Sequence, residues 1–344
     1  MKQKTVGRVP WWKIVLPVLL GLGFVGWMIA RDFDPEILSH VRFTGHALLF
    51  VLVAFLFMVG RDWGYIVRIR LFSRGDLSWR QAFRIIMLWE FTSAITPSAI
   101  GGTSVAIVFV HKEGLPVGRS AAIVLLTSFF DELYFAAVFP AVFFIVGGER
   151  LFAGPMGDEL LLFAAIGYGI KLAYLLLLSY GLFFTPVGLK WLIIKVFSLP
   201  GLRRWRSGAV KAGGDVVRSA VEIRKYRPGF WLRSFAATFL SWSSRYLVAN
   251  ALFMAFFALG DQFLVFARQL AMWIMLLVAP TPGGSGFAEY LFTHFLNDVI
   301  PVDAVIRVGT AAVIALLWRL VTYYPYLIMG AVILPRWLRR SFGK

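Results

Sequence analysis

Two short segments interrupt long apolar runs of this chain and repeat each other in residue type. The first reads Ile95-Thr96-Pro97-Ser98-Ala99-Ile100-Gly101-Gly102-Thr103, and the second reads Pro280-Thr281-Pro282-Gly283-Gly284-Ser285. In both, a tryptophan lies upstream of the Thr-Pro pair, and an arginine lies five residues before that tryptophan. Proline and glycine do not continue a helix easily, so each segment predicts a broken helix. Paired broken helices in two halves of a membrane chain indicate a transporter-like substrate site.

The composition places the whole chain in a membrane. It is 59% hydrophobic and only 15% charged, with a mean hydropathy of +0.76, whereas soluble domains carry about 25% charged residues. The chain has no cysteine, which excludes disulfides, thiol catalysis and zinc–thiolate sites. We therefore expect residues 1–344 to form a single integral membrane domain.

Apolar runs of the length needed to cross a bilayer predict the fold class. A span needs about 20 apolar residues, and six runs reach or approach that length: roughly 13–30, 44–60, 120–147, 159–184, 234–260 and 305–334. Two further runs, 82–110 and 262–297, carry the breaks. The basic residues before the first run resemble a signal peptide, but no small-x-small cleavage pattern follows, so we expect a retained anchor. The sequence predicts an all-α polytopic membrane protein with about six spanning helices.

The basic residues predict the orientation of these spans. The net charge is +17, and segment 185–233 alone holds eleven Lys and Arg against two acids. Both ends of the chain are also basic, whereas the segments 31–45, 148–159 and 298–304 are acidic or poor in base. The positive-inside rule then places both termini and 185–233 in the cytoplasm, and we expect a bacterial cytoplasmic membrane. This explains the basic excess by topology and anionic lipid, so no nucleic acid is expected as a partner.

The same charges predict how the broken runs enter the membrane. Basic segments 61–81 and 111–119 flank the run 82–110, which should therefore enter and leave from the cytoplasmic side. The run 262–297 lies between two acids and should enter and leave from outside. Two re-entrant hairpins of opposite orientation form an inverted-topology repeat. Its halves would be about 44–184 and about 234–334, with 44–60 matching 234–260 and 120–147 matching 305–334.

The breaks suggest an anion site in the middle of the membrane. We expect one helix to begin after Gly101-Gly102, capped by Thr103 or Ser104, and another after Gly283-Gly284, capped by Ser285. Free N–H groups and the positive dipole end of each helix suit a phosphate or carboxylate. The alternative is that both segments are only kinks. The predicted substrate-binding residues are Thr96, Pro97, Gly101, Gly102, Thr103, Ser104, Thr281, Pro282, Gly283, Gly284 and Ser285, with Arg245 and Arg319.

Charged residues inside the runs are the second functional signal. Each central charge costs about 2.5–3.5 kcal/mol on insertion scales, so it should have a partner or contact water. Lys171, Arg245 and Arg319 lie near the middle of their runs and are candidates to bind a lipid phosphate. The acids of the runs, which could exchange protons or form structural ion pairs, are Glu90, Asp131, Glu132 and Glu289. We expect at least one of the three cations to contact one of these acids.

No motif in the chain indicates a metal, a cofactor or an ATP-driven motor. The four histidines show no metal-ligand spacing, and Asp32-Phe33-Asp34 is better explained as part of an acidic outer loop. The Gly-Lys-Ser/Thr phosphate-binding loop of ATPases is absent from the sequence. Residues 187–198 are predicted to form an amphipathic helix at the membrane surface.

These motifs resemble a known family. The stretch 95–104, followed by 111–114 and by Asp131-Glu132-Leu133, resembles the lysylphosphatidylglycerol synthase transmembrane family. The stretch 280–289 is similar to its second signature, and the resemblance covers roughly 40–335. The family includes the flippase region of the multiple peptide resistance factor, which moves aminoacylated phospholipid between leaflets. This chain ends at Lys344, so we expect a stand-alone member without the aminoacyl-transferase domain.

The resemblance and the residues together predict translocation of an anionic lipid between leaflets. The cargo would be a phospholipid or a polyprenyl-phosphate-linked lipid, and membrane lipids are the expected partners. A homo-oligomer is compatible with the sequence. The alternatives are a membrane-embedded lipid-modifying transferase and a non-catalytic membrane partner of a lipid synthase. The transferase would need an acid–base pair and a donor site that the sequence does not reveal, so a transporter is favoured over an enzyme.

Overall fold

A computed structural model of the chain describes residues 41–342 apart from 97, 155–156, 197, 199–205, 259 and 279–280, together with Gly23. The expected first span, 13–30, lies outside the described residues except for Gly23. The helices of the first half are α3 (Gly45–Phe72), α4 (Trp79–Ile95), α5 (Ser98–Lys112), α6 (Val117–Val146), α7 (Gly148–Leu151) and α8 (Gly157–Ser179), the last continuing into the π-helical turn η1 (Tyr180–Phe184). Those of the second half are α9 (Pro186–Val196), α10 (Arg206–Ile223), α11 (Pro228–Phe256), α12 (Gln262–Met275), η3 (Leu276–Val278), α13 (Phe287–Leu296), η4 (Asn297–Val299), α14 (Ala304–Thr322) and α15 (Tyr324–Phe342).

Four helical stretches are long and apolar enough to cross a membrane. They are Gly45–Phe72, Val117–Val146, Gly157–Phe184 and Ile306–Ser341. The expected run 234–260 corresponds to helix α11, which has 29 residues and ends at Phe256. This helix is not among the stretches that are both long and apolar enough to cross a membrane. Its interior face carries Ser241, Trp242 and Arg245, and this face lines the centre of the molecule. The described part of the chain is therefore that of an α-helical membrane protein.

Three expected boundaries differ from the structure. The run 44–60 continues as helix to Phe72, so most of the predicted loop 61–81 is helical. Segment 185–233 is also largely helical, since it forms α9, α10 and the start of α11, and α9 agrees with the predicted amphipathic helix. The run 305–334 is interrupted at Tyr323, because Pro325 fits only the first turn of the helix that follows.

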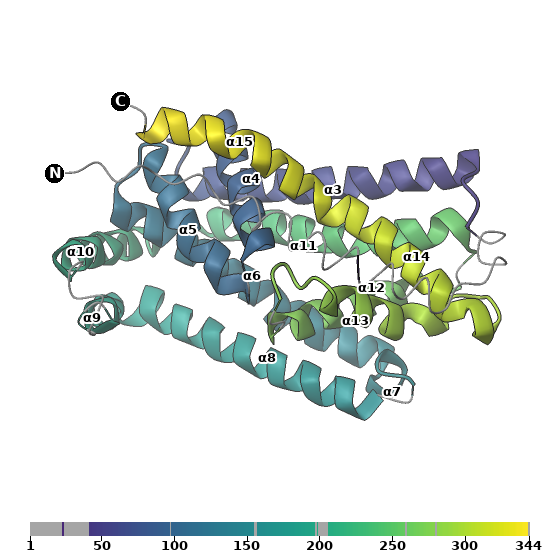
Figure 1. Ribbon diagram of the computed structural model, residues 1–344. Helices are drawn as coiled ribbons and strands as arrows, with labels where there is room; N and C mark the ends of the chain where they lie inside the picture. Colours follow the sequence, from purple (N-terminus) through teal and green to yellow (C-terminus); the bar gives the residue numbers. More distant parts are fainter. Residues whose placement is uncertain are drawn as a thin grey trace.

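Helices α3 and α11 run side by side and pack closely against each other (Figure 1). Gly64 of α3 allows the close contact, because a Cβ atom there would lie 2.6 Å from the carbonyl oxygen of Ala237. Ser241 of α11 donates a hydrogen bond to the carbonyl oxygen of Arg61 at 2.7 Å. This contact fixes the register in which the charged side chains of the two helices face each other.

The interrupted helices are too short to cross the hydrocarbon core. Helices α4, α5, α12 and α13 have 17, 15, 14 and 10 residues. At 1.5 Å per residue they reach about 15–26 Å, less than the roughly 30 Å of a bilayer core. Figure 1 shows α4 and α5 in the half of the molecule that holds α9, α10 and the end of α15, and α12 and α13 in the other half.

The two repeated arginines anchor the outer ends of these short helices. Arg84 of α4 pairs with Glu113 through Nε and Nη2, at 3.0 and 2.7 Å, and Glu113 also accepts a hydrogen bond from Trp337 Nε1. Arg268 of α12 is buried, pairs with Asp298 and donates to the carbonyl oxygens of three residues. The equivalent arginines therefore tie each pair of short helices to the neighbouring chain.

Candidate functional site

A cavity of about 250 Å³ lies at the centre of the described structure. Helices α3, α4, α6, α11, α14 and α15 contribute to its wall, together with both breaks and single side chains from α5, α8 and α12. Ten of the predicted candidate residues line it: Glu90, Thr96, Thr103, Asp131, Lys171, Arg245, Thr281, Gly283, Gly284 and Arg319. Residues that lie far apart in the sequence thus converge on one cavity, whose wall combines charged side chains with aromatic and aliphatic ones.

Other predicted residues lie elsewhere. Among the residues that the structure describes, the cavity wall does not include Gly102, Glu132, Pro282, Ser285 or Glu289. Pro97 lies outside the described residues. Gly101 and Ser104 lie within α5.

Three interruptions of the helices meet beside the cavity. Tyr323, between α14 and α15, donates its hydroxyl to the carbonyl oxygen of Ala94 at 3.0 Å, at the end of α4. The same hydroxyl lies 3.4 Å from Ser285 Oγ in the second break. The N–H of Gly283 approaches the carbonyl oxygen of Thr96 at 3.5 Å. The first break, the second break and the α14–α15 junction are therefore in direct contact.

The predicted starts of the two helices at the breaks are wrong. Helix α5 begins at Ser98, so Gly101 and Gly102 lie inside it and do not precede it. A Cβ atom on Gly102 would collide with Ser93 of α4, so this glycine serves the close packing of two helices. Thr103 and Ser104 therefore cap no helix.

The second break differs from expectation as well. Helix α13 begins at Phe287, two residues beyond the predicted cap Ser285. The N–H of Gly286 donates to Glu289 Oε2 at 2.7 Å, and those of Gly284 and Ser285 donate to backbone carbonyl oxygens of the same turn. The carboxylate of Glu289 thus takes the place that a bound anion was predicted to occupy.

The prediction that at least one of the three central cations contacts an acid of the runs is confirmed. Lys171 Nζ lies 3.1 Å from Glu132 Oε2, and Arg319 binds Glu289 through Nε and Nη2, at 2.8 and 3.2 Å. Arg319 also donates to the carbonyl oxygen of Gly283 at 3.2 Å. Arg245 is different, because its Nη1 lies 3.9 Å from Glu90 Oε2, beyond hydrogen-bonding distance.

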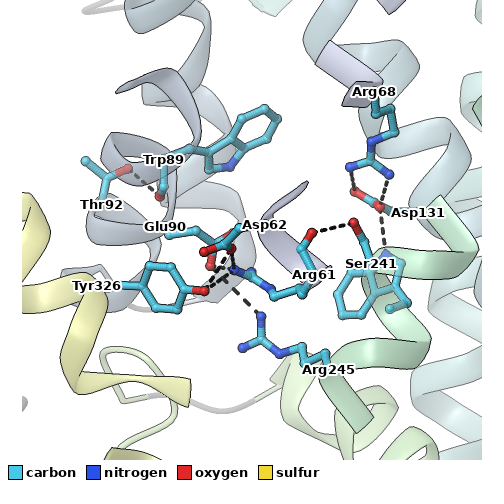
Figure 2. Close-up of polar contacts among 11 residues, drawn as sticks. Arg61, Asp62, Arg68, Trp89, Glu90, Thr92, Asp131, Ser241, Arg245 and Tyr326 are labelled. Carbon is cyan, nitrogen blue, oxygen red and sulfur yellow. Dashed lines mark hydrogen bonds and ion pairs between the residues drawn. The ribbon is translucent and has the colours of Figure 1, made fainter. Parts of the chain in front are cut away.

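Two further arginines line the cavity and were missed from the sequence. Arg61 Nη2 lies 2.6 Å from Glu90 Oε2, and its Nη1 donates to Asp62 and to the hydroxyl of Tyr326, each at 2.8 Å (Figure 2). Its head group is buried, with only 1% of the side chain exposed. In the sequence, Arg61 directly follows the apolar run 44–60 and is grouped with the topogenic charges of segment 61–81, so its place in the cavity is not evident.

Arg68 makes an equally complete set of contacts. It binds both carboxylate oxygens of Asp131, at 2.5 and 3.2 Å, and donates to Thr238 Oγ1 at 3.1 Å. Trp242 Nε1 donates to the same carboxylate at 2.7 Å. Arg61, Tyr65 and Arg68 are spaced by four and three residues, which places them on one helical face. This spacing is the signal that identifies both arginines as interior.

Several donors of the cavity wall have no hydrogen-bond partner among the described residues. They are Arg61 Nε, Arg245 Nε, Trp273 Nε1 and the hydroxyl of Thr281. Arg245 rests on the ring of Trp273, with 3.8 Å between the guanidinium carbon and the ring centre. Buried donors normally have acceptors, so this group of residues suits a ligand with several acceptor oxygens. Within the described residues, no cluster of three or more His, Asp or Glu side chains suits a metal ion.

Apolar helices of spanning length, short broken helices and a charged central cavity define an integral membrane protein of the α-helical class. The chain belongs to the family of the lysylphosphatidylglycerol synthase transmembrane region, whose sequence model matches residues 14–330. It is also similar to a UPF0104 membrane protein of Archaeoglobus fulgidus, with 28% identity over 302 residues, which covers 83% of this chain and 85% of the relative. The family inferred from the two signatures is therefore confirmed.

Proposed function

We propose that this protein moves a lipid with an anionic headgroup between the two leaflets of its membrane. The observation that carries the proposal is the group of donors around one cavity that have no partner among the described residues, Arg245 Nε among them. A phosphate offers acceptor oxygens in several directions, and a guanidinium binds such oxygens in a planar, two-pronged manner. The cargo would be a phospholipid or a polyprenyl-phosphate-linked lipid.

Arg245 is better suited to receive the phosphate than the other cations of the cavity. Arg68 and Arg319 each hold a carboxylate with two of their nitrogen atoms, and Lys171 holds Glu132. Arg245 instead has a distant contact with Glu90 and lies against the rings of Trp273 and Trp242, and about 11% of its side chain is exposed. A guanidinium in this state gains more from an added anion than one that is already neutralised.

The proposed topology places the two breaks on opposite sides of the membrane. Helices α4 and α5 would form a hairpin from the cytoplasmic side and α12 and α13 one from outside, as their limited length and opposite positions in the fold support. In this scheme α3 corresponds to α11, and α6 corresponds to α14 with α15. The termini, α9 and α10 would face the cytoplasm of a bacterial cell. Alternating movement of these inverted halves would expose the cavity to each leaflet in turn.

Cysteine labelling tests this topology in a chain without native cysteine. Val117 and Pro301 are both exposed and lie near opposite ends of the fold. We expect Val117→Cys to react with an impermeant reagent only in inverted membrane vesicles, and Pro301→Cys only in intact cells. Reaction of Val117→Cys from outside the cell would contradict the proposal that α4 and α5 form a hairpin from the cytoplasmic side.

Lipid exchange in vesicles tests the function. Purified protein in liposomes should let a fluorescent phosphatidylglycerol of the inner leaflet become accessible to an impermeant quencher, and Arg245→Gln should lower this rate at least tenfold. Arg150→Gln is the matched control, because Arg150 is largely exposed and pairs with Asp261 at the surface. Equal exchange by Arg245→Gln and the native protein would contradict binding of the headgroup at Arg245. No exchange with the native protein would favour the alternative, a non-catalytic partner of a lipid synthase. A covalently changed lipid would instead support the transferase.

A further inference from the structure

Identical residues recur in the two halves of the chain at one fixed distance. Three such pairs lie 184 positions apart, namely Arg61 and Arg245, Arg84 and Arg268, and Trp89 and Trp273. The second and third pairs belong to the short helices α4 and α12, whereas the first lies on α3 and α11. The repeat therefore extends beyond the breaks to the charged side chains of the cavity, where Arg61 is the counterpart of Arg245.

The packing of α3 on α11 relates the two halves in space as well. Gly60 and Ser244, which are also 184 positions apart, lie against each other, because a Cβ atom on Gly60 would be 3.3 Å from Ser244 Oγ. One turn later Gly64 packs against Ser241, so the two helices are antiparallel. A residue that contacts its own counterpart lies at the axis of a two-fold relation. The two cavity arginines follow this pair directly and therefore stand on either side of that axis.

Both arginines face the same carboxylate oxygen. Glu90 Oε2 lies 2.6 Å from Arg61 Nη2 and 3.9 Å from Arg245 Nη1, and Figure 2 shows both guanidinium groups approaching Glu90. The Nε atom of each arginine is buried without a hydrogen-bond partner among the described residues. The counterpart of Glu90 in the second half is Ile274, so a single carboxylate lies between two equivalent cations. In the described state this carboxylate is held by Arg61.

We propose that Arg61 is a second phosphate-binding residue, which receives the headgroup after Glu90 has moved from Arg61 to Arg245. The inference rests on the proposed function and adds a residue to its site. The Nε and Nη2 atoms form one edge of a guanidinium, and such an edge binds two oxygens of a phosphate side by side. Departure of Glu90 frees this edge of Arg61, while Nη1 keeps its contacts with Asp62 and Tyr326.

The exchange of partners leaves no buried charge alone. In the described state Glu90 compensates Arg61, and Arg245 is left to the phosphate. In the second state Glu90 compensates Arg245, and the phosphate takes the place of Glu90 beside Arg61. Loss of the partner of a buried charge is strongly destabilising, whereas a change of partners avoids that cost. Inverted repeats that rock against each other let equivalent residues exchange surroundings in this way, so the phosphate would be passed between two equivalent arginines as the cavity changes sides.

Anion binding to the whole protein in detergent, measured by titration calorimetry, tests the proposal. The probes are inorganic phosphate and dihexanoylphosphatidylglycerol. Arg245→Gln should weaken binding about tenfold or more, because Glu90 then stays on Arg61. Addition of Glu90→Gln to Arg245→Gln should recover about tenfold in affinity, because the free edge of Arg61 then takes the anion. Further addition of Arg61→Gln should remove this gain.

The control for the double variant is Arg245→Gln with Glu113→Gln. Glu113 pairs with Arg84 and Trp337 away from the cavity, so its neutralisation should recover no affinity. A double variant with Glu90→Gln that binds no better than Arg245→Gln would overturn the proposal and leave Arg245 as the site of the proposed function. A gain that persists after Arg61→Gln would also overturn it, since loss of negative charge alone would then explain the recovery.

The two probes separate this inference from the proposed function. Failure of both to bind the native protein, or equal binding by Arg245→Gln, would overturn the anion site itself and the inference with it. The expected pattern with the lipid supports a headgroup as the ligand. The same pattern with phosphate alone would overturn the lipid as cargo.

Arg61→Lys gives an independent measurement where the combined variants do not fold. Lysine keeps the charge beside Glu90 and Asp62 but lacks the two-nitrogen edge. Anion binding at Arg245 should stay close to native, whereas exchange of fluorescent phosphatidylglycerol in vesicles should fall about tenfold. Arg150→Lys at the surface is the matched control and should exchange lipid like the native protein. A purely structural Arg61 predicts that binding and exchange change together, and native exchange by Arg61→Lys would overturn the proposal.

Discussion

Helix α4 ends at Ile95 and α5 begins at Ser98, whereas before α13 the chain follows a longer turn from Thr281 to Gly286. In the second break Gly283, Gly284 and Gly286 have positive φ angles of 59°, 69° and 84°. Gly102 of the first break instead lies inside α5 against Ser93. A pair of glycines thus serves left-handed turns in one half and close helix packing in the other.

The two breaks also differ in what fixes them. The second is tied by Glu289, which holds both Arg319 and the N–H of Gly286, and by Arg319, which holds the carbonyl oxygen of Gly283. In the first break, Thr96 Oγ1 donates to the carbonyl oxygen of Thr92 at 2.6 Å. The contacts of the second break should therefore contribute more to the free energy of unfolding than those of the first.

The largest effect is expected from Glu289→Ala. This change leaves Arg319 buried without its acid, which should lower the free energy of unfolding by about 3–5 kcal/mol. Thermal unfolding in detergent measures it, with Asp76→Ala as the control, because the exposed Asp76 pairs with Arg119 at the surface. Since the two partners compensate each other, Glu289→Leu with Arg319→Met should recover much of the loss. A melting temperature like that of the native protein would show that the second break does not depend on this pair.

A smaller loss is expected from Gly283→Ala. The residue has a φ of +59°, and a Cβ atom would lie 2.9 Å from the carbonyl oxygen of Ala94 and against Tyr323. Backbone strain and crowding together should cost about 2–3 kcal/mol. Gly75→Ala is the control for strain alone, since Gly75 has a φ of +84° and open space around it. Equal losses at the two positions would mean that contact between the breaks adds nothing.

The corresponding change in the first break, Gly102→Ala, should cost less. The new Cβ atom would meet Ser93, whose Cβ and Cα lie at 2.9 and 3.0 Å. Overpacking should cost about 1–2 kcal/mol, partly offset by the better helix propensity of alanine. Gly169→Ala on α8, which has open space, should instead raise the melting temperature slightly. Adding Ser93→Gly to Gly102→Ala should restore stability, and an unchanged melting temperature would show that the α4–α5 contact is loose.

The smallest loss of stability is expected from Arg245→Gln. Glu90 keeps Arg61 as its partner, so the variant loses little more than the stacking of a cation on Trp273, at most about 1 kcal/mol. Arg319→Gln, which breaks a satisfied buried pair, should lose several times as much in the same unfolding measurement. Equal losses would remove the distinction between a structural and a ligand-binding arginine.

Much of this site follows from the sequence because its residues are costly in a membrane. Interrupted helices and buried charges persist only where something satisfies them, and so Thr96, Thr281, Arg245 and Arg319 could be assigned to one region before the fold was known. The partners could not be assigned in the same way. That Glu289 binds Arg319, whereas Glu90 is shared by Arg61 and Arg245, depends on which helices pack together.

The errors have a common origin in charges and glycines that serve two purposes. An arginine near the end of a span is compatible with a topogenic loop and with an interior helix face. Only the continuation of α3 to Phe72 shows that Arg61 lies on a helix and not in a loop. A Gly-Gly pair fits a helix start as well as a close helix contact, which is why Gly101 and Gly102 were misplaced. The break at Tyr323 does have a local signal, since Pro325 lies two residues beyond it.

Tyr323 connects three interruptions of the helices that lie far apart in the sequence. Its hydroxyl bonds the end of α4 and lies beside Ser285, while its backbone separates α14 from α15. A displacement of any one interruption therefore changes the contacts of the Tyr323 hydroxyl with the others. The hydroxyl thus couples the three interruptions, and Tyr323→Phe, which removes it, would let each of them change conformation independently.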